Sequence, residues 1–120
     1  MRLLTFASIQ VKDLEKSKDF YTRKLGFGIS SSLPDACIFN YGQGEASFAI
    51  RKPLPGFDGK EPGIGVSLWF AIDGTIEDLQ HEFNLNDVEM QGQVNNTPFG
   101  KTLNVRDPDG YNITFLEPRQ

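Results

Sequence analysis

The sequence repeats one order of elements on the two sides of a central segment rich in proline and glycine. This segment, residues 53–63, holds three prolines and three glycines, a composition typical of a connection. On each side the hydrophobic pattern predicts a strand, a helix and then three strands. The repetition predicts a single domain of 120 residues made of two modules, at about residues 1–52 and 64–120, and a chain of this length suits one compact domain.

In the first module, the alternation over residues 6–11 predicts a strand. Asp13 is expected to cap a helix whose apolar positions include Leu14, Tyr21 and Leu25 at helical spacing, and Gly26 is expected to end it. Three short strands are predicted next, over residues 27–33, 36–41 and 46–52.

In the second module, residues 66–72 predict a strand. Thr75 and Asp78 form a capping pair, and Ile76, Leu79 and Phe83 form the apolar stripe of a helix. Strands are predicted over residues 88–94, 101–106 and 112–117.

The last two of these strands flank the turn Asp107-Pro108-Asp109-Gly110. Proline presets φ for a type I turn, aspartate accepts from nearby backbone, and glycine takes the left-handed position that follows. The sequence therefore predicts a closing β-hairpin.

Three segments in the same order resemble one known family: residues 8–27, residues 68–73, and the Phe99-Gly100 turn with the closing hairpin. They resemble the vicinal-oxygen-chelate superfamily of glyoxalases, ring-cleaving dioxygenases, fosfomycin-resistance enzymes and bleomycin-resistance proteins. The resemblance implies an α+β fold in which two βαβββ modules form a curved mixed sheet around a cup, with the helices on the outer face. One fold hosts many sites, so the fold alone does not give the function.

The alternation of side chains separates two faces of the expected sheet. The apolar face, expected against the helices, contains Ala7, Ile9, Val11, Phe48, Ile50, Leu68, Phe70, Ile72, Ile113 and Phe115. The other face mixes aromatic, small and polar residues, and the resemblance implies that it lines a ligand-holding cup. An exposed sheet face or a dimer interface are the alternatives.

The resemblance also locates the metal ligands of the family's enzymes, at the positions of Phe6, Ala49, Ser67 and Thr114. None of the four is a competent ligand, because catalytic metals take imidazole, thiolate or carboxylate groups. We therefore predict no metal, no cofactor and no catalytic residue. His81 is expected on the helix surface, Cys37 as a buried inert thiol, and Glu117 in solvent near the C-terminus.

The function expected from this pattern is metal-independent binding or sequestration of an aromatic or antibiotic-like small molecule. The expected ligand-binding residues are Phe6, Ser8, Gln10, Ser47, Ala49, Arg51, Ser67, Trp69, Asn112 and Thr114. One alternative is a lyase, isomerase or dioxygenase of the same superfamily with a displaced metal site. Another is a regulatory module whose aromatic face is buried in an oligomer.

Charge and composition limit the partners. The net charge of −4, without a cluster of Lys and Arg, argues against nucleic-acid and anionic-membrane partners. No apolar run approaches the ~20 residues of a membrane span. A lone cysteine and the lack of a signal-peptide pattern favour the cytoplasm. We expect a homodimer. Pairing of the two modules within one chain and swapping of modules between chains both occur in the superfamily, and the sequence leaves both open.

Overall fold

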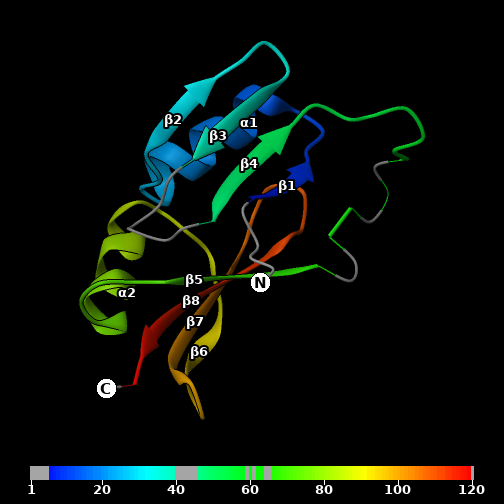
Figure 1. The fold of residues 1–120 in the computed structure, drawn as a ribbon. Coiled ribbons are helices and arrows are strands. Elements are labelled where there is room, and N and C mark those ends of the chain that lie inside the picture. Colours follow the sequence, from blue (N-terminus) through cyan, green and yellow to red (C-terminus); the bar gives the residue numbers. More distant parts are fainter. Residues whose placement is uncertain (1–5, 40–45, 59, 61, 64–65, 120) are drawn as a thin grey trace. The chain divides into compact units, whose positions relative to one another are not determined.

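The computed structural model describes residues 6–39, 46–58, 60, 62–63 and 66–119. The chain divides into two compact units, residues 1–62 and 63–120, and each is described by itself. Each unit holds a four-stranded mixed sheet with helical segments (Figure 1). The predicted α+β class and the predicted order of elements in each module are confirmed. That the two units form one domain around a cup stays a prediction.

The first unit contains a sheet in the order β1-β4-β3-β2. Its elements are β1 (Phe6–Gln10), α1 (Leu14–Asp19), η1 (Phe20–Lys24), β2 (Ile29–Ser32), β3 (Ala36–Phe39) and β4 (Ser47–Arg51). Strands β1 and β4 are parallel, with Ala7 opposite Phe48 and Ile9 opposite Ile50. The other strand pairs are antiparallel.

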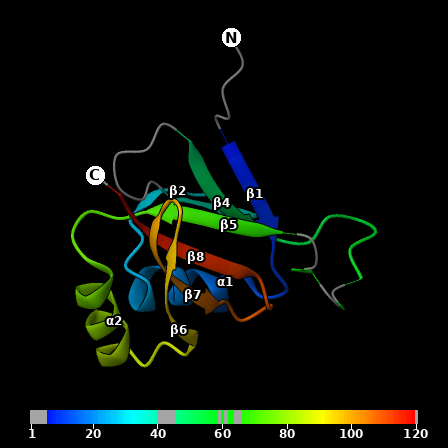
Figure 2. The ribbon, with the colours of Figure 1, turned by 90° about the horizontal axis from the view of Figure 1, so that it is seen from below.

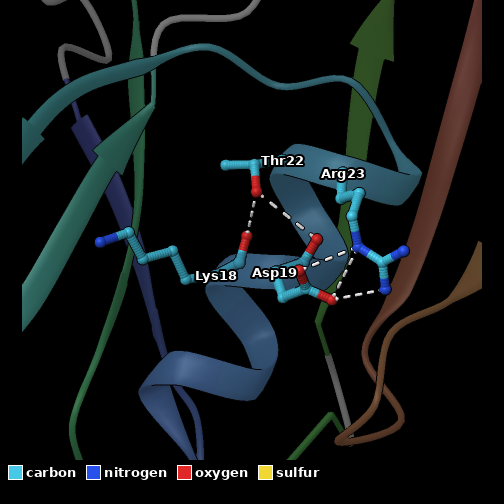
Figure 3. Close-up of polar contacts among 4 residues, drawn as sticks. All are labelled: Lys18, Asp19, Thr22 and Arg23. Atoms are coloured by element: carbon cyan, nitrogen blue, oxygen red, sulfur yellow. Dashed lines mark hydrogen bonds and ion pairs between the residues drawn. The ribbon is translucent and has the colours of Figure 1, made fainter.

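The first helix begins as predicted but changes its winding halfway. The Asp13 side chain accepts a hydrogen bond from the Lys16 N–H at 3.1 Å and caps α1. A single helix to Leu25 was predicted, whereas residues from Phe20 onward form the π-helix η1, in which the Leu25 N–H bonds the Phe20 carbonyl. The Thr22 hydroxyl donates to the Lys18 carbonyl at 2.7 Å (Figure 3). Such hydroxyl contacts four residues back along the chain are associated with bent or rewound helices.

The start of β2 also differs from the prediction. Gly26 has a φ of +84° and ends the helix as expected, and the Phe27 N–H then bonds the Tyr21 carbonyl at 2.9 Å. Phe27 therefore belongs to the helix exit, and β2 begins at Ile29 rather than at residue 27. Residues 40 and 41, predicted to end the third strand, lie outside the described residues.

An aromatic cluster fills the core of the first unit. The Tyr21 ring lies 5.5 to 5.7 Å from the rings of Phe27, Phe39 and Phe48. All four residues are buried, as are Ile9, Val11 and Ile50 from the predicted apolar face. Each such side chain contributes about 1.5–3 kcal/mol when buried. The predicted helix-facing side of β1 and β4 is thus the core side.

The second unit repeats the arrangement, with its sheet in the order β5-β8-β7-β6. Its elements are β5 (Ser67–Ala71), α2 (Ile76–Leu85), β6 (Met90–Thr97), β7 (Gly100–Arg106) and β8 (Asn112–Pro118). Strand β5 runs parallel to β8, and the other pairs are antiparallel (Figure 2). The equivalent strand orders confirm the predicted repeat.

Helix α2 packs on the apolar face of this sheet. The Thr75 hydroxyl accepts from the Asp78 N–H at 3.1 Å, which confirms the predicted cap. The predicted stripe of Ile76, Leu79 and Phe83 is buried, and the Phe83 ring lies 5.3 Å from that of Phe115 on β8. The residues of β8 that alternate with Phe115, Thr114 among them, therefore lie on the side of the sheet that faces away from α2.

Strand β6 is displaced toward the C-terminus relative to the predicted range of 88–94. Val88 is buried and its N–H bonds the Phe83 carbonyl, so it closes the helix instead of starting the strand. At the far end, the Thr97 hydroxyl accepts from the N–H groups of Phe99 and Gly100 and donates to the Gly100 carbonyl. This threonine stabilises the tight turn and keeps β6 paired with β7 up to it.

The closing hairpin has the predicted geometry. The Gly110 N–H bonds the Asp107 carbonyl at 3.0 Å, and Gly110 has a φ of +93°. The Asp107 carboxylate is buried and accepts from the N–H groups of Asp109 at 2.9 Å and Tyr111 at 2.8 Å. A buried acceptor thus organises the turn from within.

None of the helices in the described ranges is long and apolar enough to cross a membrane.

Candidate functional site

In the first unit, the predicted site residues lie on the neighbouring strands β1 and β4. Ser8 is opposite Ala49 and Gln10 is opposite Arg51. Ser8 is exposed, Ser47 is half-buried and Ala49 is buried. Phe6 pairs with Ser47 through the backbone, and its side chain lies outside the described residues.

Gln10 and Arg51 both contact the start of the connecting segment. The Gln10 side-chain carbonyl accepts from the Leu54 N–H at 2.6 Å, and the Arg51 Nε donates to the Lys52 carbonyl at 3.1 Å. Each polar group therefore helps fix the path of residues 52–54 next to the predicted face.

In the second unit, the predicted residues form a surface that we call the Trp69 face. It is the side of the sheet, opposite α2, that carries Trp69 of β5, Thr114 of β8 and Asn104 of β7. These three are register partners, Trp69 with Thr114 and Thr114 with Asn104. In the adjacent row, Ser67 pairs with Asn112. Ser67 is exposed and Asn112 is half-buried.

Trp69 is 48% exposed and has two local supports. Its indole Nε1 donates to the Ser67 hydroxyl at 3.2 Å. Its ring meets the Phe99 ring edge to face, with 6.4 Å between centroids. Phe99, in the turn between β6 and β7, is 66% exposed. The sequence prediction missed Phe99 as a site residue, although a phenylalanine in a tight turn is an available signal.

Thr114 is buried and its hydroxyl is already in use. The side chain is 3% exposed, and its Oγ1 donates to the Asn104 side-chain oxygen at 2.6 Å. Asn104 is half-buried and was also missed from the sequence. Its position on the same face follows from the pairing of β7 with β8, which the hairpin turn sets.

The residues at the family's metal-ligand positions do not fit a catalytic metal. Ala49 has no donor atom, Ser67 offers a neutral hydroxyl, and Thr114 directs its hydroxyl at Asn104. Among the described residues, no group of three or more His, Cys, Asp or Glu side chains could hold a metal ion. Metal independence itself stays a prediction.

Three other chemistry-bearing residues were given roles outside the expected ligand site. His81 is exposed on α2 and Cys37 is buried on β3, both as expected. Burial raises the pKa of the Cys37 thiol, which makes it a poor nucleophile. Glu117 was expected in solvent, but it is half-buried and its Oε1 accepts from the Ile76 N–H at 2.8 Å. It therefore caps α2, because the first N–H groups of a helix lack partners within the helix.

A pocket of about 550 Å³ lies elsewhere in the second unit, between the segment that precedes α2, the start of β7 and the end of β8. Its lining includes Asp73, Lys101, Glu117 and Arg119, and none of the predicted site residues. Two of its charged groups are engaged, Lys101 with Glu77 at 3.1 Å and Glu117 with α2. The pocket is within the size range of ligand sites, but Lys101 and Glu117 already have partners in the local fold.

Several solved structures share this fold. TnmS3, an antibiotic binding protein from Streptomyces sp. CB03234, is 24% identical over 99% of this chain and 98% of its own, with a TM-score of 0.80. UcmS2 is 23% identical over 98% and 99% of the two chains, with a TM-score of 0.78. Lactoylglutathione lyase from Agrobacterium tumefaciens is 16% identical over 96% and 92%, with a TM-score of 0.74. At these identities the similarity establishes the fold alone.

Among curated proteins, none matches this chain in sequence. The sequence of residues 3–115 does match the family described as the Glyoxalase/Bleomycin resistance protein/Dioxygenase superfamily. This match spans both units, and it agrees with the repeated strand order and with the solved structures. The chain therefore belongs to the glyoxalase/bleomycin resistance protein/dioxygenase superfamily.

Proposed function

We propose that this protein is a metal-independent small-molecule-binding protein that binds or sequesters an aromatic or antibiotic-like ligand. One observation carries the proposal. At the position where the family's metal-dependent members have a glutamate ligand, this chain has Thr114, which is buried and hydrogen-bonded to Asn104. A threonine hydroxyl engaged in this way is a poor ligand for a first-row metal ion.

The Trp69 face offers the interactions that binding needs. Trp69 leaves about half of its surface accessible, and its ring can stack on a planar ligand or contact a cation through its face. The hydroxyl of Ser67 and the amide of Asn112 lie one row away in the sheet. Such a combination of an aromatic surface and a few polar groups is typical of small-molecule sites.

The first unit is proposed to contribute the other residues of the same site. These residues are Phe6, Ser8, Gln10, Ser47, Ala49 and Arg51. The Arg51 guanidinium is the group best suited to an anionic substituent of the ligand, because it presents several donors in one plane. The similarity to TnmS3, described as an antibiotic binding protein, supports an antibiotic-like ligand.

The proposal extends to the setting of the protein. We propose a cytoplasmic homodimer in which the two units of each chain form one domain, with no nucleic-acid or membrane partner. The single cysteine, which is buried and unpaired, supports the cytoplasmic location, and the net charge of −4 supports the lack of nucleic-acid and anionic-membrane partners. Free thiols persist in reducing compartments.

Two measurements test the proposed function. The purified protein is incubated with Zn, Ni, Mn and Fe salts and desalted, and its metal content is measured. It is then screened by thermal shift against a panel of antibiotics and aromatic metabolites. A compound present at about 100 times its Kd adds about 2.7 kcal/mol to the stability of the folded state. We expect substoichiometric metal and a thermal shift with at least one compound.

The control variants separate binding at Trp69 from a general effect on stability. We expect Trp69→Ala to lose the ligand-induced shift, whereas Leu85→Ala keeps it, because Leu85 is 71% exposed on α2, on the side of the second unit's sheet opposite the Trp69 face. Stoichiometric metal binding would refute metal independence. Recovery of a chemically altered compound after incubation would instead favour the enzyme, a lyase, isomerase or dioxygenase.

A further inference from the structure

We propose that Asn104 determines specificity in the ligand site, and that it selects planar aromatic compounds with a carbonyl oxygen at the ring edge. The inference rests on the proposed function, because it assumes that the Trp69 face binds the ligand. Asn104 was not among the residues expected from the sequence.

The first step is the placement of Asn104 relative to Trp69. Trp69, Thr114 and Asn104 are partners across β5, β8 and β7, which lie side by side in Figure 2. Register partners project from the same face of a sheet, and neighbouring strands are about 4.8 Å apart. The backbones of Trp69 and Asn104 are therefore separated by roughly 10 Å, with the buried Thr114 between them. A fused aromatic ring system stacked at Trp69 can extend over Thr114 to Asn104.

The second step is the orientation of the Asn104 amide. An asparagine side chain has one acceptor oxygen and an NH₂ group with two donor hydrogens. Thr114 donates its hydroxyl to the oxygen of Asn104 at 2.6 Å, so the oxygen points toward β8 and the Nδ2 group points away from Thr114. Among the described residues, the Nδ2 group has no hydrogen-bond partner, and Asn104 is only half-buried.

The third step is the ligand chemistry that this orientation selects. A polar group that loses water on ligand binding must gain a partner or pay a desolvation cost. The Nδ2 group can only donate, so a carbonyl oxygen satisfies it and an ammonium group does not. A carbonyl in the plane of an aromatic ring presents its lone pairs in that plane, where an edge-on amide donor can reach them. Thr114 thus stands at a metal-ligand position of the family, and here its hydroxyl holds the Asn104 amide so that the NH₂ group is oriented as a donor.

The protein provides its own probe, because Trp69 is its only tryptophan. Quenching of Trp69 fluorescence is titrated with fluorenone and with fluorene, two planar tricyclic compounds that differ by a carbonyl in place of a methylene. We expect the wild-type protein to bind fluorenone about tenfold more tightly, the size of one hydrogen bond of about 1.4 kcal/mol.

Two variants test the role of the amide. Asn104→Asp keeps the shape and the acceptor for Thr114 but removes both donor hydrogens. We expect it to bind fluorenone about tenfold more weakly and fluorene with unchanged affinity. Thr114→Val keeps the shape of the side chain but removes the hydroxyl that orients Asn104. We expect about a threefold loss for fluorenone alone. Asn84→Asp, the same change at an exposed position on α2, should leave both affinities unchanged.

The outcomes decide between the two proposals. Equal binding of the two compounds by the wild-type protein would overturn the role of Asn104. An unchanged preference for fluorenone in Asn104→Asp would also overturn this role. If Asn104→Asp does not fold, an unchanged preference in Thr114→Val has the same meaning. If neither compound quenches Trp69, the proposed ligand class is wrong. The proposed function fails only if the thermal-shift panel also finds no ligand.

Discussion

Replacing Asp107 by alanine should destabilise the protein by about 3 kcal/mol, and the value follows from two hydrogen bonds. The Asp107 carboxylate, in a residue that is 5% exposed, accepts from the Asp109 N–H at 2.9 Å and from the Tyr111 N–H at 2.8 Å. Alanine would leave both donors without this acceptor. A buried donor left unpaired costs about 1–3 kcal/mol. The Tyr111 N–H is buried and the Asp109 N–H is only partly buried, so a value of about 3 kcal/mol, in the lower half of the summed range of about 2–6 kcal/mol, is the appropriate estimate.

The measurement is urea unfolding followed by circular dichroism, with a thermal scan alongside. Domains of this size unfold with an entropy of about 2.1 cal/mol/K per residue, so about 3 kcal/mol lowers Tm by roughly 12 °C. The matched control is Asp107→Asn, which keeps one side-chain oxygen that can accept both bonds, loses the charge and replaces the other oxygen by an NH₂ group. We expect it to lose about 1 kcal/mol. The reasoning is wrong if the alanine variant stays within about 0.5 kcal/mol of the wild type, or if the two variants are equally unstable.

Three further outcomes follow from individual contacts. Glu117→Ala should lower the stability of the folded state by about 1 kcal/mol and Glu117→Gln by less, because glutamine keeps an acceptor for the Ile76 N–H; equal losses in urea unfolding would contradict the cap. The ion pairs with Arg23 and Lys101 lower the pKa values of Asp19 and Glu77. A lowered folded-state pKa gives stability that is present at neutral pH and lost as the pH falls through it. Asp19→Asn should therefore be less stable than the wild type at pH 7 and equally stable in strong acid, and the difference in stability should shrink in about 1 M salt. A stability difference independent of pH would exclude the ion pair as its source. The Cys37 thiol, whose pKa is raised by burial, should react with a thiol reagent in urea and not in native buffer, and equal rates in the two conditions would refute its burial.

The parts of the fold that local chemistry determines could be predicted from the sequence. Asp13, Thr75 and Gly26 have the helix-capping roles expected of them. The hairpin turn at Asp107 was equally predictable, since proline, aspartate and glycine each favour one position in it. In such cases a residue acts on its immediate neighbours, and spacing along the chain is sufficient evidence.

Two of the departures from the predicted fold involve hydroxyl groups. The apolar spacing of Leu14, Tyr21 and Leu25 is compatible with an α-helix throughout, whereas the structure has a π-helix in the segment where the Thr22 hydroxyl donates to the Lys18 carbonyl. The extension of β6 likewise depends on the three hydrogen bonds of Thr97. Threonine has several possible partners at similar energies, and hydrophobic periodicity does not choose among them.

In the candidate site, the type of a residue shows which chemistry is excluded, whereas the geometry shows which contact the residue makes. The sequence alone shows that a threonine at position 114 is a poor metal ligand, because this follows from the chemistry of the side chain. It does not show that the hydroxyl points along the sheet to Asn104 rather than toward a ligand, because that depends on the register of β7 with β8 and on burial. This hydrogen bond shows what Thr114 does at a metal-ligand position of the family: it orients the Asn104 amide and its donor hydrogens. Under the role proposed for Asn104, its donor chemistry is a stronger guide to the ligand than the missing glutamate.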